Sequence, residues 1–66
     1  MSKVKIEFDC NNAFFGESEF ENREAISIIL DHLSLCVYNN GLYNDKILDG
    51  NGNSIGDIKF IGFKND

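Results

Sequence analysis

The sequence predicts an α+β domain in which one helix packs on a three-stranded antiparallel or mixed sheet, in the order strand, helix, strand, strand. Three observations predict it: apolar residues that alternate with charged ones at the start, a long amphipathic segment that opens on a helix cap, and an Asn-Gly turn near the end. A chain of 66 residues is the size of a single small domain, here residues 1–66. Because so small a core barely offsets the entropy lost on folding, we expect oligomerisation to assist it.

The first element is a strand. Apolar and charged side chains alternate over residues 3–10, in the order Lys3, Val4, Lys5, Ile6, Glu7, Phe8, Asp9, Cys10. A period of two is typical of a half-buried strand, with one face packed and the other in water.

Residues 11–18 form a loop that contains two adjacent aromatic residues, Phe14 and Phe15. Loops are usually polar, so this pair needs a reason. One interpretation is that one or both plug the end of a small core. The other is that they form an aromatic anchor for a partner protein.

A helix is predicted over about residues 19–39. Ser18 and Glu21 match the S-x-x-E capping box, and Asn39, Asn40 and Gly41 form a stop signal. At 100° per residue, one apolar stripe forms the predicted core face. Its members are Ile26, Ile29, Leu30, Leu33, Cys36 and Val37.

A second apolar stripe lies on the far side of this helix. Ile28, His32 and Leu35 follow the spacing i, i+4, i+7, with Ala25 close by. Scattered surface Ile and Leu residues are common and need no explanation. The other interpretation is that a second helix, from a symmetric copy or a partner, packs on this stripe. We predict Ile28, His32 and Leu35 as a self-interface and the chain as a homo-oligomer.

A hairpin closes the chain, with a short strand over 46–49, a turn over 50–53 and a last strand over 54–63. Asn51-Gly52 is a strong hairpin signal. A two-residue loop pairs Lys46 with Asp57 and Leu48 with Ile55, whereas a three-residue loop shifts the pairing. Either way, the sheet keeps two exposed edges.

The charge balance argues against direct nucleic-acid binding. Six Lys and Arg residues stand against eleven Asp and Glu residues, for a net charge of −5, and the basic residues are scattered. No run of about 18 apolar residues predicts a membrane span. Glu17, Glu19, Glu21 and Glu24 cluster. They either complement the helix dipole or form an anionic patch that docks on a basic partner surface.

Candidate chemistry is sparse, and we expect no catalytic residues, metal or cofactor. Asp49, Asn51, Asn53 and Asp57 resemble a calcium loop, but Ser54 stands where Gly is needed and Phe60 where Glu is needed. Cys10 and Cys36 are expected to be buried, reduced thiols in a cytoplasmic protein. His32 and Cys36 share neighbouring helix faces without a third orienting residue.

The segments KIEFDCNNAFF (residues 5–15) and ILDGNGNSIGDIKF (residues 47–60) resemble short uncharacterised proteins encoded by bacteriophages and prophages. The resemblance implies a phage accessory origin and carries no activity or site residues. Small acidic phage proteins often act by binding a host or defence protein. We therefore expect a non-enzymatic inhibitor or modulator that binds its partner through Phe14, Phe15 and the four glutamates. The alternative is a small assembly subunit that self-associates through its helix or sheet edges.

Overall fold

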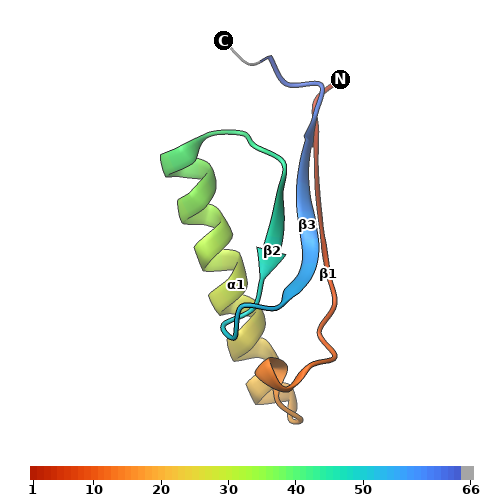
Figure 1. The fold of residues 1–66 in the computed structure, drawn as a ribbon, viewed down its shortest axis with the longest axis vertical. Coiled ribbons are helices and arrows are strands. Elements are labelled where there is room, and N and C mark those ends of the chain that lie inside the picture. The colour runs from red at the N-terminus through yellow and green to blue at the C-terminus, as the bar shows by residue number, and fades with distance from the viewer. Residues whose placement is uncertain (65–66) are drawn as a thin grey trace.

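The computed structural model describes residues 1–64 and confirms the predicted α+β architecture (Figure 1). Its elements are β1 (Lys3–Phe8), the short 3-10 helix η1 (Ala13–Phe15), α1 (Glu19–Asn40), β2 (Asp45–Leu48) and β3 (Ser54–Ile61). The three strands are antiparallel, in the spatial order β1-β3-β2. β3 is therefore central, and β1 and β2 form the two edges. No helix within residues 1–64 is long and apolar enough to cross a membrane.

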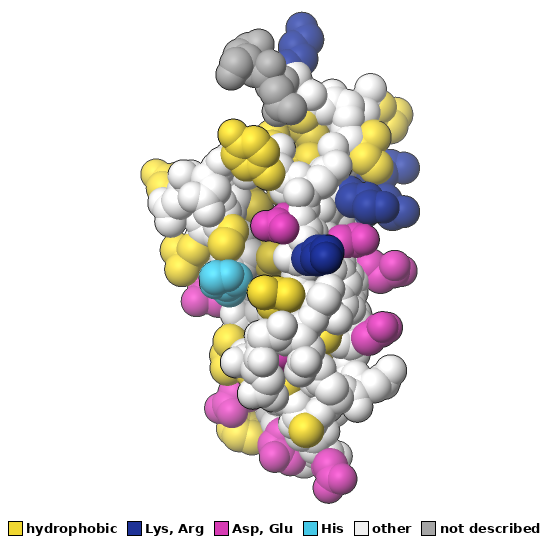
Figure 2. Space-filling view, in the orientation of Figure 1, with side chains coloured by type: hydrophobic (Ala, Val, Ile, Leu, Met, Phe, Trp, Pro, Cys, Tyr) yellow, Lys and Arg dark blue, Asp and Glu magenta, His cyan; other side chains and the backbone are white. Residues whose placement is uncertain are grey.

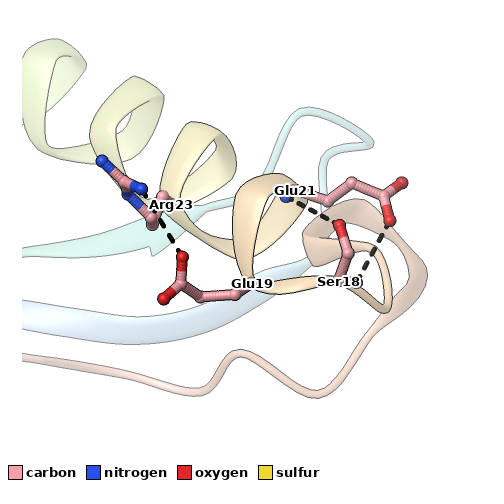
Figure 3. Close-up of polar contacts among 4 residues, drawn as sticks. All are labelled: Ser18, Glu19, Glu21 and Arg23. Atoms are coloured by element: carbon pink, nitrogen blue, oxygen red, sulfur yellow. Dashed lines mark hydrogen bonds and ion pairs between the residues drawn. The ribbon is translucent and has the colours of Figure 1, made fainter.

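The ends of α1 lie where the sequence predicts them. Figure 3 shows the capping box, in which the Ser18 hydroxyl accepts a hydrogen bond from the N–H of Glu21 and the Glu21 carboxylate accepts one from the N–H of Ser18. Both bonds satisfy backbone donors that a helix start leaves unpaired. At the other end Gly41 has a φ of 94°, and its N–H donates to the carbonyl of Val37. The positive φ stops the helix there.

The β2–β3 hairpin combines features of both predicted registers. The N–H of Asp49 donates to the carbonyl of Asn53, so three residues form the turn, with Gly52 at a φ of 85°. This turn pairs Leu48 with Ser54 rather than Ile55, and the register then shifts between Ile47 and Leu48. The resulting bulge restores the predicted pairing of Lys46 with Asp57.

The core lies between α1 and the β2–β3 side of the sheet. Its buried side chains come from η1, α1, β2 and β3, and are Phe15, Ala25, Ile29, Leu33, Ile47 and Ile58. A helix about 10–12 Å wide covers roughly two strands spaced about 4.8 Å apart, so a third strand projects beyond it. Here that strand is β1, which Figure 1 shows on the side of β3 away from α1.

Two predictions about the core face hold only in part. The predicted packed face of β1 is covered at one end, where Phe8 packs against the core, whereas Val4 and Ile6 are 47% and 45% exposed on the part of the sheet that α1 leaves uncovered. The buried stripe of α1 is also rotated from the predicted one: Ala25 is buried, whereas Leu30 is 46% exposed. Ala25 turns inward because η1 packs against the start of α1 and covers it.

Candidate protein-binding surfaces

η1 joins the start of α1 to the hairpin turn. Phe15 is fully buried, with its ring stacked near that of Phe8 (centroids 6.3 Å apart) and edge-on to that of Phe14 (5.3 Å). Phe15 therefore plugs the core and is not available to a partner. Phe14 is half-buried and lies against Gly50 of the turn, where an added Cβ would come within 2.5 Å of its ring.

Asp49 organises the turn that resembles a calcium loop. Its carboxylate accepts hydrogen bonds from the N–H groups of Asn51 (2.8 Å) and Asn53 (2.9 Å), from the Asn53 side chain (3.2 Å) and from the Asn12 side chain. Burial raises the pKa of Asp49, but the hydrogen bonds from Asn53, Asn51 and Asn12 outweigh it and leave the pKa below its ordinary value. The carboxylate thus ties the loop before η1 to the hairpin.

We expect Asp49→Asn to lower the free energy of unfolding at neutral pH and to weaken the dependence of that free energy on pH. A carboxyl whose pKa is lowered by folding stabilises the folded state fully above its unfolded pKa of about 3.9, and this contribution is lost as pH falls through the folded pKa. Urea unfolding at pH 7 and pH 3 measures this contribution. We expect the difference in the free energy of unfolding between wild type and variant to be smaller at pH 3 than at pH 7. A difference that is equal at the two pH values would contradict this role of the Asp49 carboxylate. Asp31→Asn, on the exposed side of α1, is the control.

The four predicted glutamates gather around the start of α1 but differ in what they contact. Glu21 is used by the cap: the Ser18 hydroxyl and the N–H groups of Glu17 and Ser18 lower its pKa. Glu19 lies 3.5 Å from Arg23, and both are exposed (Figure 3). Within residues 1–64, Glu17 and Glu24 have no ion-pair partner. Two of the four glutamates therefore carry charges that no ion pair among residues 1–64 offsets.

The residues predicted as a self-interface, Ile28, His32 and Leu35, are all exposed on α1. Ile28 is 54% exposed and borders a hollow of about 170 Å³ together with Phe14 and Glu24. Leu35 is 55% exposed. His32, between them along the helix, also lines a larger cavity toward β2. The structure thus places Ile28 beside two predicted partner-binding residues.

The larger cavity, the α1–β2 cleft, is a feature that the sequence did not predict. Its volume is about 490 Å³, which is within the usual range for a binding pocket. The cleft lies between the second half of α1, the loop after it and the strands β2 and β3. Its lining residues are Ile29, His32, Leu33, Cys36, Val37, Asn40, Gly41, Tyr43, Asp45, Lys46, Ile47, Leu48, Ile58 and Phe60. These residues come together because β2 and β3 lie under α1. That arrangement depends on the strand order, which the periodicity of the sequence does not predict.

The thiols occupy different environments. Cys36 is half-buried in the cleft, and its Sγ lies 3.5 Å from Nε2 of His32. Cys10 is exposed in the loop after β1, contrary to the prediction that both are buried, because the strand ends at Phe8. Both are free thiols. Within residues 1–64, no three His, Cys, Asp or Glu side chains gather to hold a metal ion.

We compared the chain with known proteins. No protein-family model, no curated protein and no solved structure matches this chain.

Proposed function

We propose that this chain is a non-enzymatic protein-binding module that acts by direct contact, as a phage-encoded inhibitor or modulator of a host or defence protein. The observation that carries the proposal is the α1–β2 cleft, an open cavity with mainly apolar walls in a chain of only 66 residues. Such a cavity suits an apolar side chain or short segment of another protein. The net charge of −5 favours a partner with basic residues around that segment.

Selection of binders from a displayed random-peptide library tests this proposal and does not require the host protein to be identified. We expect enriched peptides to carry an apolar or aromatic residue flanked by Lys or Arg. We expect Cys36→Arg, which places a charge in the cleft, to weaken their binding at least tenfold, a loss of about 1.4 kcal/mol.

Leu35→Arg is the matched control for this variant. It puts the same side chain at the neighbouring position, which lies outside the cleft, and we expect it to leave peptide binding unchanged. Equal losses in the two variants would contradict binding in the cleft. Failure to enrich any peptide would contradict the proposed function itself.

A second candidate is a small assembly subunit that self-associates. The observation that favours it is the position of β1, an edge strand whose apolar side chains are not covered by α1.

A further inference from the structure

β1 carries the features of a strand that pairs with another chain. It has six residues and no proline, and it forms one edge of the sheet. The N–H of Asp9 donates to the carbonyl of Ile55 (2.9 Å), which continues the β1–β3 ladder by one residue. Because bonding alternates along an antiparallel pair, the backbone groups of Val4 and Ile6 point away from β3. Exposed edges of this kind are templates for strand addition.

The chain also exposes more surface than a compact monomer of its size. Its accessible surface is 5289 Å², against roughly 4,200 Å² for a compact monomer of this mass. Its radius of gyration is 13.0 Å, against roughly 11 Å for a compact chain of this length. The surplus of roughly 1,000 Å² is comparable to the roughly 800 Å² that each partner buries in a standard interface.

Like charges lie side by side on the outer face of the β1–β3 ladder. Lys5 is directly opposite Lys59, and Glu7 is directly opposite Asp57. Only Asp57 has an opposite charge on its other side, from Lys46 of β2. Figure 2 shows the resulting edge, with Lys and Arg side chains above Asp and Glu side chains on the right. Like-charged pairs directly opposite each other are destabilising, so this edge favours a neighbour with the reverse arrangement.

We propose that a second copy of this chain supplies that neighbour, through antiparallel pairing of β1 with β1 about a two-fold axis at Ile6. This register sets Lys5 opposite Glu7 of the second copy and Lys3 opposite Asp9. On the other face it sets Val4 opposite Phe8, so that the apolar surfaces left bare by the two helices become continuous. The result is a closed dimer with one six-stranded sheet and both helices on the same face.

Other registers are less favourable. A shift of the pairing by two residues also keeps both helices on one face. Depending on its direction, it sets Lys5 opposite Lys5 of the second copy or Glu7 opposite Glu7 of the second copy, which places like charges together. β2 is a poorer edge, since it has four residues and a bulge beside it. The dimer leaves the α1–β2 cleft open, and the inference therefore stands independently of peptide binding there.

Charge reversal tests the register. Sedimentation equilibrium from about 1 µM to about 1 mM measures the dimer dissociation constant. We expect Lys5→Glu and Glu7→Lys each to raise it about tenfold, because each creates two like-charged pairs across the dimer. The combined variant reverses both charges, and we expect it to return to within about threefold of wild type.

The same substitutions keep the monomer folded, because each turns a like-charged pair with Lys59 or Asp57 into an opposite-charged one. Ile28→Glu with Leu35→Glu is the control on α1 and leaves the β1 dimer intact. A chain that is monomeric over the whole range, or a combined variant as weak as the single ones, overturns the proposal. Dissociation by the α1 control alone would place the interface on the helix instead.

Discussion

Phe15→Ala is expected to remove much or all of the free energy of unfolding in water at 25 °C. Phe15 is fully buried, and its ring packs with those of Phe8 and Phe14 where η1, the sheet and α1 meet. Truncation of a buried Phe to Ala costs about 3–5 kcal/mol. A domain of this size has a total stability of roughly 3–10 kcal/mol, so one substitution removes much or all of it.

Far-UV circular dichroism during thermal and urea unfolding measures the effect. Phe20→Ala is the matched control, since Phe20 is 68% exposed on α1, and we expect it to change stability by no more than about 0.5 kcal/mol. A cooperative transition in Phe15→Ala close to that of wild type would show that η1 does not hold the core together.

Gly56→Ala is the second large loss we expect, and it arises from backbone contact rather than from a cavity. Gly56 pairs with Phe8 across β1 and β3, and a Cβ there would lie 1.9 Å from the carbonyl oxygen of Glu7 and 2.5 Å from Cα of Phe8. Neither atom belongs to a flexible side chain, so β1 has to move away from β3. We expect a loss of at least about 3 kcal/mol.

Hydrogen exchange shows whether β1 detaches, because the amides of β1 and β3 then lose protection before those of α1. Gly52→Asn is the control. A Cβ at Gly52 meets nothing within 4 Å, and Asn tolerates its positive φ at a cost of about 1 kcal/mol or less. Equal losses in the two variants would contradict the close approach of the strands.

Local signals predicted the elements well. The capping box at Ser18 and the glycine at the end of α1 placed the helix within one residue, because such signals depend only on near neighbours. The hairpin was predicted for the same reason. The bulge was not, since the sequence left open whether the turn has two residues or three.

Features that depend on strand order could not be predicted from the sequence. Periodicity predicted a buried face for β1, but whether a helix covers that face depends on the order β1-β3-β2. The same order creates the α1–β2 cleft, which brings His32 and Cys36 opposite residues of β2. The burial of Phe15, which excludes it as an anchor, depends on how η1 docks against Ala25.

The alkylation rate of Cys36 in the presence of a selected partner tests binding in the cleft most directly. Cys36 lines the cleft, and Cys10 is exposed in the loop after β1, so each molecule carries its own reference thiol. With iodoacetamide and peptide mapping by mass spectrometry, we expect bound partner to slow the reaction of Cys36 at least tenfold and to leave Cys10 unchanged. An unchanged rate at Cys36 under saturating partner would contradict the assignment of the cleft as the protein-binding site.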